Sequence, residues 1–269
     1  MSVIVCRPEQ VAHPYYVEGL GVNIHSSQEF CYAIYHHPML FLDKFADQSV
    51  IDFIRDELGM GFLAARMEQR IKTKEKPEEL MLMFMQECDY YTGAELNRFR
   101  QTVTSFRRMT PLEYAKAKTD YLVRFKQYGK AITGYEAILE EADDKKDDLF
   151  IGKVWNNLGA CYARIFQFQK AMDAYEKAYT RKKDLKILEK MYHLTCLCPD
   201  LELKDRYRSL VSQQLKEQWD KDFDQAGEKA AGSEELKKLD ELFQKDSIRR
   251  AEAAGNLVEE WKKEYRAMG

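Results

Sequence analysis

The sequence predicts an almost wholly helical protein with a small β element near its start and a long helical hairpin near its end. Three observations support this fold class. Apolar residues recur at helical spacing through most of the chain, Ser/Thr-x-x-Glu segments mark several helix starts, and the 269 residues include only 6 prolines. Because proline interrupts helices and these short polar segments cap them, the chain is expected to be mainly α.

The first 25 residues differ in pattern from the rest. Short β-branched or aromatic runs occur at 3–6, 15–17 and 22–24, with Pro8 and Pro14 between them. Runs of this kind favour strands, and a proline between strands removes no hydrogen bond from a sheet. We expect two or three short strands in this region.

Helix starts are well marked between residues 26 and 126. Ser26 to Glu29, Thr92 to Glu95 and Thr110 to Glu113 are capping boxes, and Pro77 suits the first turn of a helix. The expected helices run from about 27 to before Pro38, then from near Asp47 to Leu58, and over 62–72, 77–91, 93–108 and 111–126.

After residue 200 the chain becomes long and highly charged. The segments 203–229 and 234–267 each carry one narrow apolar stripe, and Gly232-Ser233 separates them. This pattern predicts an antiparallel hairpin that turns at Gly232-Ser233, with a weaker stretch at 246–250. We expect the hairpin to be a second contact surface, through self-association or a partner helix. The alternative is a cap that completes the helical array.

A repeat motif lies in the middle of the chain. It reads Trp155-x2-Leu158-Gly159-x2-Tyr162, followed by Phe168, Ala171, Tyr175 and Ala178. This pattern resembles the tetratricopeptide (TPR) motif, W-x2-L-G-x2-Y and then A-x3-F, in which small residues stand where two helices cross. The segment 128–135 echoes 168–175, and the charged run 143–148 between them is typical of a loop insertion. A third, degenerate unit is expected from Leu185.

The resemblance implies a mainly α, TPR-like α–α solenoid, and the amino-terminal part is similar to uncharacterised bacterial TPR proteins. We divide the chain into 1–110, mostly helical with the β element, 111–200, the TPR-like repeats, and 201–269, the hairpin. Because one repeat cannot bury its apolar face alone, several helix pairs must stack. The helices before residue 110 are expected to cap the array, and the alternative is a separate recognition domain.

In TPR domains the first helix of each pair lines a groove, so the resemblance also implies a binding surface. Its candidate residues are Lys153, Asn156, Asn157 and Arg164 opposite the Trp155 face, and Lys116, Asp120 and Arg124 one unit earlier. Amides and cations of this kind can hold an extended peptide or a carboxylate. The alternative is an ordinary exposed face with intrahelical pairs such as Lys116 with Asp120.

Other kinds of chemistry find little support in the sequence. A net charge of -3 supplies no general attraction to nucleic acid or to an anionic membrane. No run of 18 uncharged apolar residues predicts a membrane span, and no signal peptide is expected. Cys31 with His36-His37 lacks the paired spacing of a zinc site, and Cys196-x-Cys198 lacks the spacing of a redox motif. We therefore expect no metal, no cofactor, no nucleic acid and no membrane partner.

The six cysteines are scattered through apolar segments, which favours reduced thiols and a cytoplasmic location. The favoured function is a non-enzymatic adaptor that binds a protein or peptide. A peptide-sensing regulatory protein is the alternative, followed by an enzyme with a site in the amino-terminal region.

Overall fold

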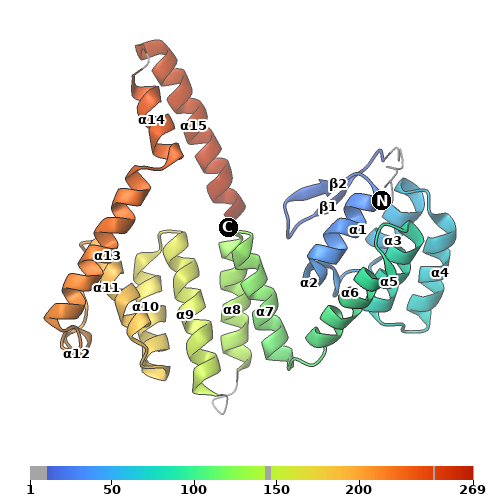
Figure 1. The fold of residues 1–269 in the computed structure, drawn as a ribbon, viewed down its shortest axis with the longest axis horizontal. Helices are drawn as coiled ribbons and strands as arrows, with labels where there is room; N and C mark the ends of the chain where they lie inside the picture. Colours follow the sequence, from blue (N-terminus) through green and yellow to red (C-terminus); the bar gives the residue numbers. More distant parts are fainter. Residues whose placement is uncertain (1–10, 143–146, 245, 269) are drawn as a thin grey trace. The chain divides into compact units, whose positions relative to one another are not determined.

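Helices account for most of the chain in the computed structural model, which describes residues 11–142, 147–244 and 246–268 (Figure 1). The prediction of a mainly α protein with a small β element is confirmed. The chain divides into two compact units, Met1–Tyr121 and Leu122–Gly269. The predicted three-part division, with boundaries at 110 and 200, stays a prediction.

The β element of the first unit is a two-stranded antiparallel hairpin. β1 (Tyr15–Val17) pairs with β2 (Val22–Ile24), and Val17 lies opposite Val22. Gly21 supplies the positive φ of +67° that the turn requires, a conformation that costs glycine little. The third run expected to form a strand, 3–6, lies outside the described residues.

The remaining elements of the first unit are helical. They are α1 (Ser27–His36), α2 (Pro38–Phe41), α3 (Gln48–Asp52), the π-helical turn η1 (Phe53–Glu57), α4 (Gly61–Lys72), α5 (Pro77–Cys88), α6 (Gly93–Phe106) and most of α7 (Pro111–Arg124). Phe30 of α1 lies at the centre of the core, with ring contacts to Phe41, Phe45, Phe53 and Phe84. The apolar faces of these helices therefore pack around a core of aromatic side chains.

The predicted capping boxes form with one variation. Thr92 and Glu95 make both bonds of the box at α6, and Thr110 with Glu113 does the same at α7. At α1 the Ser26 hydroxyl accepts from the backbone N–H of Glu29, but the Glu29 carboxylate accepts from the N–H of His25. Each start is thus set by a local exchange of hydrogen bonds.

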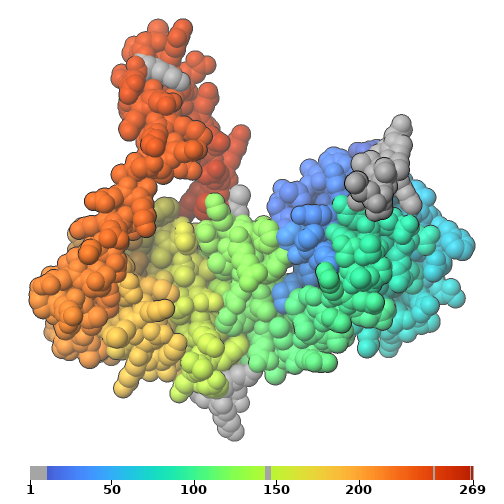
Figure 2. Space-filling model, in the orientation of Figure 1, coloured from blue at the N-terminus to red at the C-terminus, as the bar shows by residue number. Residues whose placement is uncertain are grey.

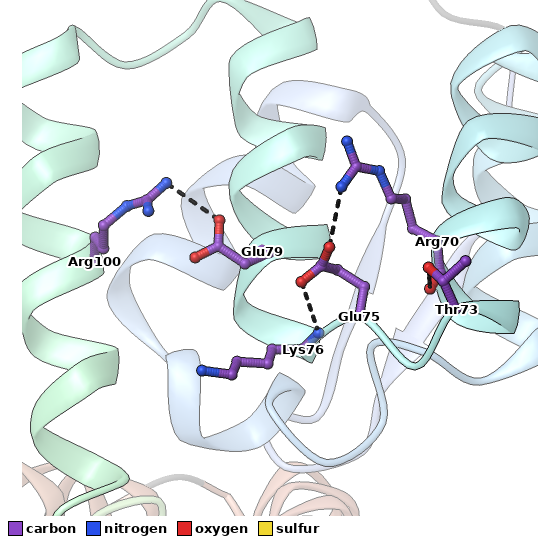
Figure 3. A network of polar contacts seen from close by, with 6 residues as sticks. All are labelled: Arg70, Thr73, Glu75, Lys76, Glu79 and Arg100. Carbon is purple, nitrogen blue, oxygen red and sulfur yellow. Dashed lines mark hydrogen bonds and ion pairs between the residues drawn. The ribbon is translucent and has the colours of Figure 1, made fainter.

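A polar network on the surface fixes the connection between α4 and α5 (Figure 3). The Arg70 guanidinium donates to Glu75 at 3.0 Å, and the Thr73 hydroxyl donates to the Arg70 carbonyl at 2.8 Å. Arg100 of α6 pairs with Glu79 of α5 at 3.2 Å. These side chains are largely exposed, so they orient the loop more than they stabilise the fold.

The second unit is a run of consecutive helices. They are the end of α7, then α8 (Tyr128–Glu141), α9 (Asp148–Arg164), α10 (Phe168–Arg181), α11 (Leu185–Leu197), α12 (Asp205–Arg208), α13 (Gln213–Ala231), α14 (Glu234–Phe243) and α15 (Ser247–Met268). α9 packs against α10 and α8, and α10 packs against α11. Neighbours among α8 to α11 run in opposite directions (Figure 1).

α9 and α10 pack closely together at Gly159 of α9. A Cβ atom placed there would lie 2.8 Å from two ring carbons of Tyr175 on α10, which is buried. This confirms that Gly159 stands where no side chain fits. Gly152 lies about two turns earlier on the same face of α9. It allows a second close approach, because a Cβ atom there would lie 3.4 Å from the Cβ atoms of Arg181 and Lys182.

The carboxy-terminal hairpin is present, but the predicted position of its turn is wrong. α13 and α14 follow one another in the same general direction, and α15 returns and packs against α14 (Figure 1). The turn therefore lies between Phe243 and Ser247. At Gly232-Ser233 the glycine has an ordinary φ of -83°, and the Ser233 hydroxyl caps the next helix. Because α13 ends and α14 is capped directly after it, the helix is interrupted here, but the chain does not reverse its direction.

The first segment of the hairpin, predicted to start at residue 203, also begins later than predicted. Residues 203–212 contain only the short α12, and the Ser212 hydroxyl caps α13. Trp219 on α13 is buried, whereas none of the described side chains of α14 or α15 is. Figure 2 shows these last helices in orange and red with much of their surface open.

Candidate functional site

The predicted binding residues of the second unit lie on one side of α9. Lys153, Asn157 and Arg164 are four and seven residues apart, which places them on one helical face, with Asn156 beside them. Leu158, Gly159 and Tyr162 lie on the other side and are buried. We call the first group the α9 face. The packing of α9 on α10 leaves it uncovered at Lys153 and Arg164.

A chain of hydrogen bonds crosses the middle of the α9 face. The Lys190 ammonium of α11 donates to Asn156 Oδ1 at 2.8 Å, and Asn156 Nδ2 donates to Asn157 Oδ1 at 3.1 Å. Asn157 Nδ2 then donates to Tyr135 Oη of α8 at 3.4 Å. This polar ladder of Lys190, Asn156, Asn157 and Tyr135 joins three helices. It holds both amides in defined orientations.

Lys190 is the charged end of the polar ladder. Its ammonium lies 5.6 Å from the ring centroid of Tyr175, and burial lowers its pKa below the ordinary value. The nearby carboxylates of Asp184 and Glu189 act in the opposite direction. A partly buried ammonium that donates to a neutral amide is a fixed donor rather than half of an ion pair.

Lys153 and Arg164 lie at the two ends of the α9 face. Both side chains are exposed, and neither has an ion-pair partner within the described ranges. Eleven residues of helix separate them, which corresponds to about 16 Å. The two cations are therefore available to a ligand that lies along the helix.

The second predicted group is arranged differently. On α7, the Lys116 ammonium pairs with the Asp120 carboxylate at 2.7 Å, which is the intrahelical arrangement given as the alternative. Both belong to the first unit, and Arg124, which is exposed, belongs to the second. Pairing of Lys116 with Asp120 leaves less of either charge for a ligand.

A groove of 460 Å³ on the opposite side of α9 was not anticipated from the sequence. It is lined by Glu136, Leu139, Glu140, Trp155, Leu158, Tyr162, Lys170, Asp173, Ala174 and Lys177, from α8, α9 and α10. We call it the α8–α10 groove. Trp155, expected on a packed face, is only half-buried.

Aromatic rings and charges meet in the α8–α10 groove. The Lys177 ammonium lies 4.2 Å from the ring centroid of Trp155. The Tyr162 hydroxyl donates to the Glu136 carboxylate, and burial together with this hydrogen bond raises the pKa of Tyr162 to about 12. Tyr162 thus stays a neutral donor under ordinary conditions.

No family model, curated protein or solved structure matches this chain. The resemblance to TPR proteins therefore rests on the sequence pattern, which is strongest over 155–178 and recurs in part at 128–135.

In the described parts of the chain, no helix is long and apolar enough to cross a membrane. The same residues contain no group of three or more His, Cys, Asp or Glu side chains placed to hold a metal ion.

Proposed function

We propose that the protein is a non-enzymatic adaptor of TPR-like architecture that binds a protein or peptide segment through the α9 face. One observation supports this most strongly. Two amides fixed by the polar ladder lie between two exposed cations on the same helix. This combination suits a peptide in extended form that carries a carboxylate.

Each part of the face has a role in this proposal. The amides of Asn156 and Asn157 present donor and acceptor atoms to a peptide backbone. Because the ladder already restricts their side chains, binding costs less conformational entropy than it would at free asparagines. Lys153 or Arg164 pairs with the carboxylate, from an acidic side chain or from a chain end.

The proposal predicts that charge on the α9 face contributes to affinity. A library of peptides with free carboxy-termini would be screened against the full chain, and the best binder measured by fluorescence polarisation. The double variant Lys153→Gln/Arg164→Gln should bind this peptide at least about tenfold more weakly, equivalent to about 1.4 kcal/mol. Its thermal unfolding should change little, because both positions are exposed.

A matched control removes the same charge elsewhere. Lys221 and Lys229 on α13 are exposed, and Lys221→Gln/Lys229→Gln should bind as the parent does. If both double variants weaken binding equally, the effect is one of general charge, and the assignment to the α9 face is wrong.

A second candidate surface is the hairpin of α14 and α15. Phe243 is 61% exposed and Trp261 is 51% exposed, which is unusual for large apolar side chains. We propose that these side chains mediate self-association or contact a partner helix. Sedimentation velocity of the full chain and of Phe243→Ser/Trp261→Ser tests this, and equal sedimentation at high concentration would count against self-association.

A further inference from the structure

In the α8–α10 groove, a lysine ammonium lies over each of two aromatic rings. Lys177 lies 4.2 Å from the centroid of Trp155, and Lys170 lies 5.5 Å from the centroid of Tyr162. Seven residues separate the two rings on α9, and seven residues separate the two lysines on α10. Because α9 and α10 run in opposite directions (Figure 1), the later lysine meets the earlier ring. The groove thus has two similar ends, about 10 Å apart.

α8 forms the third wall of the groove and contributes two carboxylates to it. Glu136 of α8 accepts the hydrogen bond of Tyr162, and Glu140 follows one helical turn later. α8 and α9 run in opposite directions (Figure 1), so the chain of α8 after Glu136 runs toward the turn of α9 that carries Trp155. The Tyr162 end therefore combines a ring, an ammonium and a carboxylate, and Glu140 adds a further carboxylate to the lining. The middle is apolar and is lined by Leu139, Leu158 and Ala174.

The charges of the groove favour a cation as its ligand. Its lining holds three carboxylates, those of Glu136, Glu140 and Asp173, against the two ammonium groups. In the described part of the chain, neither Lys170 nor Lys177 forms an ion pair, and Asp173 accepts only from the neutral amide of Gln169 at 3.2 Å. The two ammonium groups thus lie over ring faces, where the electrostatic potential attracts cations.

We propose that the α8–α10 groove binds a linear aliphatic diamine or polyamine whose two ammonium groups are about 10 Å apart. The ligand's ammonium groups replace those of Lys177 and Lys170, which turn outward into solvent. Its methylene chain covers the apolar middle of the groove. Because the two ammonium groups belong to one molecule, the second binds at a high effective concentration once the first is in place.

The volume of the groove supports a small molecule rather than a protein segment, since 460 Å³ suits a ligand of this size. Binding of a diamine in this groove is independent of the adaptor function. It concerns the opposite side of α9, and each can fail without the other.

The test follows the indole N–H signal of Trp155 by NMR in the full-length, nitrogen-15-labelled protein. The chain has 3 tryptophans, and Trp155→Phe assigns the signal. 1,8-Diaminooctane should shift this signal and saturate. 8-Amino-1-octanol, which has one ammonium, and 1,4-diaminobutane, which is too short, should bind at least about tenfold more weakly. Octanedioate, with the same span and the opposite charge, should not bind.

Variants separate the roles of the ring and of the lysines. Trp155→Leu should weaken binding of 1,8-diaminooctane, with the shifts of neighbouring amides as the readout. Lys177→Gln should strengthen it severalfold, because the internal competitor for the ring is removed. Lys221→Gln, on α13, removes the same charge at a distance and should leave affinity unchanged.

Three results would overturn the proposal. One is binding of octanedioate as tight as that of the diamine, which would make the lysines anion receptors. Another is weaker diamine binding by Lys177→Gln, which would mean that Lys177 does not compete with the ligand for the Trp155 ring. The third is tighter binding of a short peptide with two lysines, which would assign the groove to a protein partner. The Lys177→Gln result decides even if Trp155→Leu fails to fold.

Discussion

Gly159 shows how the absence of a side chain sets the distance between two helices. Tyr175 of α10 occupies the space that a Cβ atom would need. Gly159→Leu should therefore lower the free energy of unfolding by about 1 to 3 kcal/mol through overpacking. Removing a helical glycine gains at most about 1 kcal/mol, so overpacking dominates. Urea unfolding measures the difference.

Gly227 on α13 provides the matched control. It lies inside a helix, and no atom lies within 4 Å of the Cβ that it lacks. Gly227→Ala should therefore leave stability unchanged or raise it by up to about 1 kcal/mol. A Gly159→Leu protein as stable as the parent would mean that α9 and α10 do not cross closely.

Tyr162 links stability to pH. Its pKa is raised to about 12 in the folded protein, from an ordinary value of about 10. The stability that depends on its protonated hydroxyl is complete below pH 10 and is lost as pH rises toward 12. Tyr162→Phe lacks this contribution at every pH. The difference between the urea concentrations at which the parent and the Tyr162→Phe variant are half unfolded, the gap in urea midpoint, should therefore decrease between pH 9 and about 11.5.

The other tyrosines with raised pKa are common to both proteins, so they do not alter this comparison. A gap that stays constant across the range would show that folding does not raise the pKa of Tyr162.

At the scale of the helices, the capping boxes permit a direct test. Thr92→Ala removes the hydroxyl that accepts from the backbone N–H of Glu95 at the start of α6. The expected cost is about 1 kcal/mol in the free energy of unfolding. Thr104→Ala, in the interior of the same helix, is the control. Its exposed hydroxyl only donates back to the carbonyl of Arg100, so stability should be unchanged or slightly higher.

These caps also show which parts of the fold could be predicted from the sequence. A capping box depends on four consecutive residues, so Thr92 and Thr110 were identified correctly as helix starts. The pattern around Gly159 was equally local, and its close packing was confirmed. The direction taken after Gly232 depends on how α13, α14 and α15 pack, and no short segment determines that.

The candidate sites also have parts that the sequence predicts and parts that it does not. The spacing of Lys153, Asn157 and Arg164 placed them on one face of α9, whereas the bond from Lys190 to Asn156 joins segments 34 residues apart. The α8–α10 groove depends on the separation of three helices and on the conformations of Lys170 and Lys177. A sequence shows the seven-residue spacing of its rings and lysines but not that they face each other.

At the scale of the second unit, the carboxy-terminal helices differ in how firmly they are held. Trp219 on α13 is buried against α11, where its ring lies 5.6 Å from that of Tyr192 and its carbonyl is 3.1 Å from His193 Nε2. A chain that ends at Gly232 keeps these contacts. It should unfold cooperatively at nearly the temperature of the full chain, as measured by circular dichroism.

A chain that ends at Ser212 tests the opposite case. It lacks Trp219 and uncovers α11, so its free energy of unfolding should fall by about 3 kcal/mol or more. If the chain ending at Gly232 aggregates while the full chain does not, α14 and α15 complete the core of the unit, and their assignment as a contact surface is wrong.

The lack of buried side chains in the described parts of α14 and α15 has a consequence for how the protein opens. Their backbone hydrogen bonds can break without disturbing the packing around Gly159 and Tyr175. In deuterated water, amide protons of these two helices should exchange through local opening, well before those of α9 and α10, which require a much larger opening. A partner that covers Phe243 and Trp261 would slow exchange there first, so the pattern of protection would locate the contact before the partner's structure is known.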